Sequence, residues 1–316
     1  MDKIGRRSAI AVAASLLALP LAAQAQGLVS IKAAGVPEDS ITPALWAAQS
    51  GLFRKHGLDV QIDAQRSGSA TTAGVVGGAY QFGKSSLISI IAAHARGFPI
   101  VVVAPGGVYQ SNAHSGLIVK SDSPIRTGAD LNGKTIAVSA LNDLYTIGAY
   151  SWVDAHGGDS STVKLVEIPI SAVFDAVVGG RIDAGNTIDP ELHNALQTRK
   201  VRFLADTDSA IAPRFMYTAW FATLDYARNN RPIVRNFQSA IREAAAFSNK
   251  NPGQTVDALS KFSSVDTSVI AKMPRAIYGT VLDPRMLQPL INATARYKVI
   301  PATFDARDLI DPALRD

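Results

Sequence analysis

Cysteine is absent from all 316 residues of the sequence. Its absence excludes a disulfide framework, a thiolate metal site and a catalytic cysteine. Aromatic residues make up only 7% and charged residues only 18% of the chain, whereas 47% of it is hydrophobic. This apolar fraction can bury a core that offsets the chain entropy, so disorder over most of the chain is excluded. The length is typical of two domains.

Positive charge is also sparse outside the N-terminus. The formal net charge is +5, and Lys3, Arg6 and Arg7 against Asp2 account for two of these five charges. The net charge of the rest of the chain is weak, and its lysines and arginines form no cluster. This charge distribution excludes the electrostatic footprint of a nucleic-acid-binding protein.

Motifs of metal and hydrolytic chemistry are missing. The five histidines form no H-x3-H pair and no H-E-x-x-H motif, which argues against a zinc site. No G-x-S-x-G elbow occurs, although a triad assembled only in space stays open. His114 lies near Asn112, where the chain is predicted to cross between two domains. Either a hydrogen bond in a hinge or a contact with a ligand is a possible role for this histidine.

The first 25 residues have the pattern of a secretory signal peptide. A basic segment at 1–7 precedes an Ala/Leu-rich stretch at 9–22, and Ala23-Gln24-Ala25 fits the small-x-small rule for signal peptidase. The apolar stretch is short for a membrane span. Arg6-Arg7 leaves twin-arginine export open beside the general route, which we favour. We therefore expect a periplasmic protein, separated from cytoplasmic nucleotides.

Strand-like runs alternate with helical patterns through most of the chain. The first set has strands at 29–34, 58–62, 80–82 and 100–104 and helices at 43–55, 69–76 and 86–95. After a strand at 116–119 and a polar break at 121–124, the second set has strands at 135–139, 164–168, 183–187 and 201–205 and helices at 143–156, 172–178 and 191–198. The run 216–223 then leads to a helical tail from residue 232.

This order predicts an α/β protein of two lobes, each a mostly parallel sheet flanked by helices. Residues 26–119 and 216–316 form lobe 1 in this prediction, and the inserted residues 120–215 form lobe 2.

Residues 78–85 match the G-x4-G-K-S pattern of a phosphate-binding loop. Its intervening Ala-Tyr-Gln-Phe alternates like a strand, a helical pattern precedes Gly78, and no convincing carboxylate for magnesium follows. We therefore reject a nucleotide site. The stretch Gly83 to Ser86 is instead predicted to join a strand to a helix, where amides and hydroxyls favour an anion. Capping of that helix by one serine is compatible with this role.

Similar junctions precede the helices at 43, 70 and 143. Ligands of open α/β sheets bind beyond the carboxyl ends of the strands, so these junctions can converge on one crevice. Ser69, Ser85, Ser86 and Asn142 would hold an anionic head group there. Charge would come from Arg66, Lys84 or Arg214, with a hinge salt bridge as the alternative for Arg214. Three tyrosines either line the rest of this crevice or pack in the core: Tyr109, Tyr145 and Tyr217.

The run from Trp46 to Val60 resembles the A-x-x-x-G-L-F-x-x-x-G-L-x-V stretch of the NMT1/THI5-like, SsuA-type periplasmic substrate-binding proteins. These are receptors of nitrate, sulfonate and taurine importers of the ABC class. Further matches follow in the same order at 80–83, 95–97, 117–119, 122–125, 129–137, 180–184 and 188–190. Each match is modest, and their collinearity carries the resemblance.

The resemblance implies a periplasmic-binding-protein type II fold with the ligand cleft between the lobes. By motif position it implies ligand contacts at Ser40, Ile41, Gly68, Ser69, Ser85, Ser86, Asn112, Asn142, Leu144 and Asp189. Ile188 stands where the family often has an aromatic residue, which puts an aromatic wall at this point in doubt.

We therefore predict an extracytoplasmic receptor that closes its lobes around a small organic anion, a sulfonate or carboxylate. As a monomer it would deliver this ligand to a membrane permease and its ATPase, with no cofactor, no metal and no enzymatic activity. The alternative is a THI5-like pyrimidine-precursor synthase or a pyrimidine-binding protein. Yeast relatives in the wider superfamily make a thiamine pyrimidine precursor with their own histidine.

Overall fold

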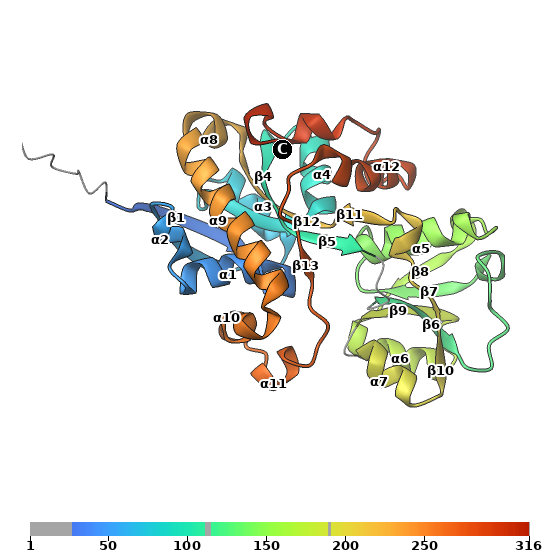
Figure 1. Cartoon of the computed structure of the whole chain (residues 1–316). Helices are drawn as coiled ribbons and strands as arrows, with labels where there is room; N and C mark the ends of the chain where they lie inside the picture. The colour runs from blue at the N-terminus through green and yellow to red at the C-terminus, as the bar shows by residue number, and fades with distance from the viewer. Residues whose placement is uncertain (1–26, 111–114, 189–190, 316) are drawn as a thin grey trace, which may run out of the picture.

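The computed structural model describes residues 27–110, 115–188 and 191–315, and it has two α/β lobes joined by a small third sheet (Figure 1). Lobe 1 is built on a five-stranded sheet of order β2-β1-β3-β12-β4. Lobe 2 is built on a five-stranded sheet of order β10-β6-β9-β7-β8. The expectation of two mostly parallel α/β lobes is confirmed.

The sheet of lobe 1 combines strands from both ends of the chain. β1 pairs in parallel with β2 and β3, whereas β12 runs antiparallel to β3 and β4. Its strands are β1 (Val29–Gly35), β2 (Leu58–Ala64), β3 (Phe82–Ser86), β4 (Ile100–Pro105) and β12 (Thr218–Thr223).

Two neighbouring residues of β3 show how helices cover both faces of this sheet. Phe82 stacks on Phe237 of the long helix α9 (Arg231–Lys250), with ring centroids 4.0 Å apart. Gly83 points to the opposite face, where a Cβ would lie 2.7 Å from Val75 of α3 (Gly68–Val76) and 2.8 Å from the Phe221 ring. Gly83 is therefore required by close packing.

Further helices complete lobe 1. The N-terminal ones are η1 (Asp39–Ile41), α1 (Thr42–Gln49), α2 (Leu52–Lys55) and α4 (Leu87–Ala95). The C-terminal ones are α8 (Leu224–Asn229), η5 (Pro252–Thr255), α10 (Val256–Ser263), α11 (Thr267–Ile270), η6 (Pro284–Met286), α12 (Gln288–Arg296), η7 (Ala306–Leu309) and η8 (Pro312–Leu314).

Lobe 2 has a sheet in which β7, β8 and β9 are parallel and β6 is antiparallel to β9 and β10. Its strands are β6 (Ser115–Lys120), β7 (Thr135–Val138), β8 (Lys164–Glu167), β9 (Ala184–Ile188) and β10 (Val201–Ala205). Its helices are η2 (Ala129–Leu131), α5 (Leu144–Ala155), η3 (Ser160–Thr162), α6 (Ile170–Val178), α7 (Glu191–Gln197) and η4 (Asp208–Ala210). Because β6 belongs to this sheet, the chain enters lobe 2 before the boundary predicted at residue 120.

The two lobes are connected through the third sheet, of order β11-β5-β13. β5 (Gly107–Gln110) leads out of lobe 1, β11 (Arg214–Met216) leads back, and β13 (Ile277–Tyr278) comes from the C-terminal part. Figure 1 shows these strands between the lobes.

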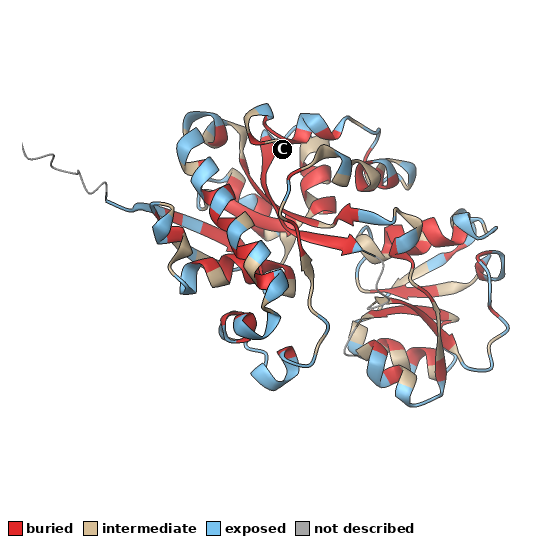
Figure 2. Ribbon diagram, viewed as in Figure 1, coloured by how far each residue is buried: buried red, intermediate tan, exposed pale blue. Residues whose placement is uncertain are grey.

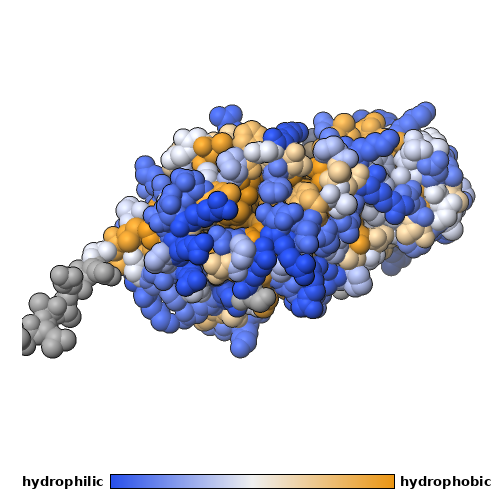
Figure 3. All heavy atoms as spheres, turned by 90° about the horizontal axis from the view of Figure 1, so that it is seen from above, coloured by the Kyte–Doolittle hydropathy of each residue, from blue (hydrophilic) through white to orange (hydrophobic). Residues whose placement is uncertain are grey.

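Buried residues concentrate in the strands and on the helix faces turned to them (Figure 2). On the face in Figure 3, hydrophilic side chains cover most of the surface and hydrophobic ones form separate groups. Within the described ranges, no helix is long and apolar enough to cross a membrane.

Several predicted elements differ from the structure. The strand predicted at 80–82 is β3 at Phe82–Ser86, so Gly83, Lys84 and Ser85 lie inside a strand and the helix begins only at Leu87. The helix predicted at 43–55 is two helices, α1 and α2, separated at Gly51 with φ +77°. Three further elements, β5, β13 and α8, are not predicted by the sequence pattern.

Candidate ligand-binding site between the lobes

The carboxyl ends of the parallel strands face each other across the third sheet. In lobe 1 these ends lead into 36–41, 65–68 and 86, and in lobe 2 into 139–143, 168 and 206–208. Contact between the two edges is direct, because Leu144 and Ile147 of α5 pack against the core of lobe 1. We call the residues at these two edges the interlobe site.

The N-terminus of α3 forms one part of the interlobe site in lobe 1. Ser67 caps this helix by accepting a hydrogen bond from the Ala70 amide at 3.2 Å, and its hydroxyl lies 2.9 Å from that of Ser69. Ser69 is exposed and Gly68 half-buried. A Cβ at Gly68 would collide with Ser85 Oγ, so glycine is needed at this position.

Ser85 supplies a buried hydroxyl beside this helix end. The residue is 1% exposed, and its Oγ has no hydrogen-bond partner. Ser86 is half-buried, ends β3 and precedes α4 without making a side-chain cap. The first amides of a helix have no partner within the helix and attract negative charge. The α3 N-terminus with Ser85 is therefore suited to an anion.

Lys84 is fully buried and is engaged by neighbours in lobe 1. Its Nζ lies 2.5 Å from Glu38 Oε1 and 2.5 Å from Ser40 Oγ. Glu38 is partly exposed, with 42% of its side chain accessible. The positive charge of Lys84 is thus already balanced, so it adds little attraction for an anion. Lysine in the G-K-S run is a strand residue in a buried ion pair, and the phosphate-loop reading is wrong, as the sequence analysis concluded.

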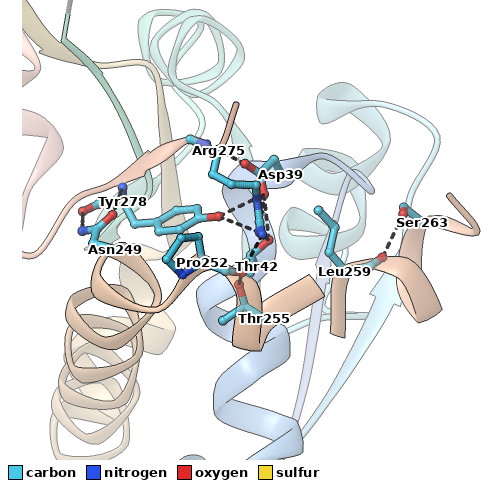
Figure 4. Close-up of polar contacts among 10 residues, drawn as sticks. Asp39, Thr42, Asn249, Pro252, Thr255, Leu259, Ser263, Arg275 and Tyr278 are labelled. Atoms are coloured by element: carbon cyan, nitrogen blue, oxygen red, sulfur yellow. Dashed lines mark hydrogen bonds and ion pairs between the residues drawn. The ribbon is translucent and has the colours of Figure 1, made fainter. Parts of the chain in front are cut away.

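The loop that carries Glu38 and Ser40 is fixed from the C-terminal part of the chain (Figure 4). Asp39 accepts hydrogen bonds from Arg275 Nε at 2.9 Å, from the Ala276 amide at 2.6 Å and from Tyr278 Oη at 2.9 Å. Ser40 is 3% exposed and Ile41 is fully buried in the core of lobe 1. Arg275 thereby positions this edge of the interlobe site.

The start of α5 forms the facing part in lobe 2. Asn142 is exposed with φ +63°, and Leu144 is half-buried. Asp143 caps α5 by accepting from the Thr146 amide at 2.9 Å, and it also accepts from Ser139 Oγ at 2.7 Å. Burial raises the pKa of Asp143, against these hydrogen bonds.

Carboxyl groups gather beside α5 where β10 ends. Asp206 Oδ2 accepts a hydrogen bond from Tyr109 Oη of β5 at 2.6 Å. Asp208 is 3% exposed, and a Cβ at Gly148 would lie 2.5 Å from its Oδ1, so this carboxyl lies against the backbone of α5. Burial, with the charges of Asp206 and Asp143, raises the pKa of Asp208 to about 8.

Two tyrosines lie between these charged groups. Burial raises the pKa of Tyr145, and the charges of Asp208, Asp143 and Glu38 raise it further. The pKa of Tyr217 is raised by burial and then by Glu38 and Asp39. Because Glu38 belongs to lobe 1 and Tyr145 to lobe 2, the carboxylates of both lobes act on one region.

Other predicted residues lie at the margin or outside the described ranges. Arg66, beside the α3 N-terminus, and Arg214, on β11, are exposed. Asn112, His114 and Asp189 fall outside the described residues. Three of the histidines are engaged elsewhere: His56 bonds Glu243, His94 packs on Phe304 and His156 stacks on Trp152.

Four acidic residues of the interlobe site are not among those predicted from the sequence: Glu38, Asp143, Asp206 and Asp208. Their one available signal was position, because each follows the carboxyl end of a predicted strand. Asn186, inside β9, gave no such signal.

Two proteins of known sequence are similar to this chain over most of its length. The chain is 26% identical over 278 residues to a binding protein of Brucella abortus, covering 83% of this chain and 80% of that protein. It is 24% identical over 228 residues to a 4-amino-5-hydroxymethyl-2-methylpyrimidine phosphate synthase of Legionella pneumophila, covering 69% of this chain and 68% of the synthase.

Solved structures share the fold at low sequence identity. The periplasmic aliphatic sulphonate binding protein SsuA of Escherichia coli matches with a TM-score of 0.73 and 19% identity, covering 91% of this chain and 93% of SsuA. The periplasmic nitrate-binding protein NrtA of Synechocystis PCC 6803 matches with a TM-score of 0.69 and 14% identity, covering 90% of this chain and 86% of NrtA. The family described as NMT1/THI5 like matches residues 38–255, and the chain belongs to this family.

Proposed function

We propose that this protein is an exported solute-binding receptor of an ABC importer, which closes its lobes around a small organic anion. In this proposal it works in the periplasm as a monomer and passes the solute to a membrane permease and ATPase. It is not an enzyme. The fold that it shares with sulfonate- and nitrate-binding proteins supports the receptor role.

The observation that supports an anion is the α3 N-terminus with the unpartnered hydroxyl of Ser85. Gly68 allows this hydroxyl to approach the helix end, and Arg66 adds an exposed positive charge beside it. A sulfonate or carboxylate there would accept hydrogen bonds from helix amides and from Ser85.

Closure follows from contacts to both lobes. A solute shifts the equilibrium between open and closed forms only by its difference in affinity for the two. An anion at α3 that also contacts α5 across the interlobe site would bind the closed form more tightly than the open form. The hinge lies in the third sheet, whose strands β5 and β11 link the lobes.

The experiment is a binding measurement on two matched serine variants. Ser85 and Ser248 are both buried with an unpartnered Oγ, but Ser248 lies in α9, on another element. We expect alkanesulfonates or carboxylates to raise the melting temperature, and Ser85→Ala to weaken their binding about tenfold to a hundredfold, because one hydrogen bond to a charged group is lost.

Ser248→Ala is the control and should leave affinity unchanged. Equal affinity of Ser85→Ala and the parent protein would remove Ser85 from the anion site while leaving the receptor role intact. Stabilisation by no anion at all would overturn the proposed function.

The Legionella relative keeps the pyrimidine-precursor synthase as a second candidate. Cell fractionation separates the two, because a receptor is expected in the periplasm with its N-terminal segment removed. A cytoplasmic protein with an intact N-terminus would favour the synthase.

A further inference from the structure

A groove of about 530 Å³ lies where α12 of lobe 1 meets α5 of lobe 2, and we call it the α5–α12 groove. Figure 1 shows these two helices beside each other at the junction of the lobes. The groove contacts the last turns of α5 at Ser151 and Ala155, whereas the interlobe site lies at the first turn. With the rise per residue of an α-helix, the two places lie about 10–15 Å apart along α5. The groove is therefore separate from the interlobe site.

The wall of the groove formed by lobe 1 carries hydrogen-bond donors with a positive charge. Arg285 precedes α12, and Asn292 and Arg296 are four residues apart on one face of this helix. Asp283 accepts from Nε and Nη2 of Arg285, and Asp154 accepts from Nη2 of Arg296. A guanidinium group has five N–H donors, so both arginines retain donors for a ligand.

A chain of hydrogen bonds fixes the orientation of the Asn292 amide. The backbone amide of Ala306 donates to Gln288 Oε1 at 2.8 Å, which turns Gln288 Nε2 toward Asn292. Gln288 Nε2 donates to Asn292 Oδ1 at 2.9 Å, and Thr303 Oγ1 donates to the same oxygen at 2.7 Å. The oxygen of Asn292 is therefore occupied, and its Nδ2 is left to donate to a ligand.

The lining of the groove favours an anion with an apolar body. Among the described residues, no carboxyl group lines it, and the charged side chains that do are those of Arg285 and Arg296. The volume is in the range of sites for small molecules, about 300–1,000 Å³. Apolar side chains form most of the remaining lining: Ala155, Ala210, Ile211, Ala212, Pro289 and Ala293.

We propose that the α5–α12 groove binds an elongated organic dicarboxylate, with one carboxylate at Asn292 and Arg296 and the other at Arg285. With the rise per residue of a helix, Arg285 and Asn292 lie about 10 Å apart, which a chain of several methylene groups spans. These methylene groups cover the apolar lining between the two charged ends. The site goes beyond the proposed function, because it requires no ligand in the interlobe site.

The test uses decanedioate as the probe and decanoate as the analogue with a single carboxylate, in calorimetric titrations of the protein. We expect decanedioate to bind about two- to fivefold more tightly than decanoate, the range of an exposed ion pair. Arg285→Gln should remove this preference, and Arg296→Gln should weaken the binding of both probes. Arg235→Gln, at an exposed arginine of α9, is the matched control and should change neither affinity.

A second set of variants separates the groove from the interlobe site. Ala155 is exposed and lines the groove, so Ala155→Trp should fill it and weaken the binding of decanedioate at least tenfold. Ala246→Trp, at an exposed alanine of α9, should keep the affinity of the parent protein. Ser85→Ala should also keep it, because Ser85 belongs to the interlobe site. Thermal unfolding without the probe checks that both tryptophan variants are folded, and Arg296→Gln decides the test if Ala155→Trp is not.

Absence of decanedioate binding, or binding that both Ala155→Trp and Arg296→Gln leave unchanged, would overturn the site. Equal affinities for decanedioate and decanoate, or a preference that survives Arg285→Gln, would refute the dicarboxylate. Loss of binding in Ser85→Ala would place the probe in the interlobe site and also refute the proposal. All of these results leave the receptor function standing, since that function is tested by binding at the interlobe site.

Discussion

Asp208 combines burial, two neighbouring carboxyls and a free oxygen in one side chain. Its pKa of about 8 means that the folded protein holds a proton that the unfolded chain, with a carboxyl pKa near the ordinary 3.8, releases well below neutrality. The folded state thus binds more protons than the unfolded state between these two values. Folding stability must then depend on pH over the same interval.

We expect the free energy of unfolding of the solute-free protein to fall as the pH rises from about 4 to about 8. The contribution of Asp208 is complete below the unfolded pKa and is lost progressively up to the folded pKa, with a limiting slope of about 1.4 kcal/mol per pH unit. Denaturant titrations across this range measure it. Asp208→Asn should flatten the profile, and an unchanged profile would show that Asp208 is ionised in the folded protein.

Lys84 shows what local sequence can reveal about a residue's role. The alternating pattern around it, the helical pattern before Gly78 and the lack of a magnesium carboxylate together reject a phosphate loop, and the structure places Lys84 in a strand. The sequence did not show that Lys84 lies inside β3 and pairs with Glu38, because that pairing joins residues far apart in the chain. Asp206 and Asp208 were missed for a related reason: Asp-Thr-Asp-Ser reads as a solvent-exposed turn, and only the packing of α5 buries it.

At the scale of elements, the loop 36–41 depends on a distant anchor (Figure 4). Arg275 and Asp39 have side-chain exposures of 11% and 15%, and their closest N–O distance is 2.8 Å. Thr42 and Tyr278 complete the group, because their hydroxyl oxygens each accept a hydrogen bond from Arg275 Nη2. The segment between α11 and β13 therefore ties the C-terminal part to one wall of the interlobe site.

Replacing Arg275 by leucine should leave Asp39 buried without its cation. Breaking a buried ion pair in this way costs about 3–5 kcal/mol, and we also expect weaker solute binding because the loop carrying Glu38 and Ser40 loosens. Arg285→Leu is the matched control, since Arg285 pairs with Asp283 but is 91% exposed. Thermal unfolding of both variants is the measurement. Equal losses in the two would contradict the anchor.

The boundaries of strands could be predicted where the local sequence pattern is strong. They could not be predicted where packing against distant segments determines them. Strands β1, β2, β4 and β10 agree with the predicted runs within about two residues. β3 does not, because Gly83 and Lys84 are poor strand formers, and contacts with α3, β12 and Glu38 hold them in the sheet. β5 and β13 are short and exist through pairing with distant segments.

At the scale of the whole molecule, a second contact joins the lobes through α5 and α12. Asp154 of α5 accepts from Arg296 Nη2 at 2.9 Å and from Tyr297 Oη at 3.0 Å. The Tyr150 and Tyr297 rings lie 5.4 Å apart. This contact borders a groove of about 530 Å³ that is lined by both lobes. Rotation of one lobe against the other must change it.

We expect Arg296→Ala combined with Tyr297→Phe to loosen the arrangement of the lobes without touching the solute. The absence of cysteine allows two labels to be placed cleanly, at Asp122→Cys in lobe 2 and Asp257→Cys in lobe 1. The distance distribution between spin labels should broaden in the double variant and narrow again with bound solute. An unchanged distribution would show that the third sheet alone sets the lobe angle.

The position of β12 has a consequence for how the chain is made. This strand lies between β3 and β4, although more than a hundred residues separate it from either in sequence. Lobe 2 is continuous and can form its sheet as soon as it emerges, whereas in lobe 1 the edge strand β4 is separated from the rest of the sheet by a gap until residue 223 has arrived. Lobe 1 is therefore expected to be completed last, so during synthesis its β3 and β4 edges stay open to chaperones and to misassembly.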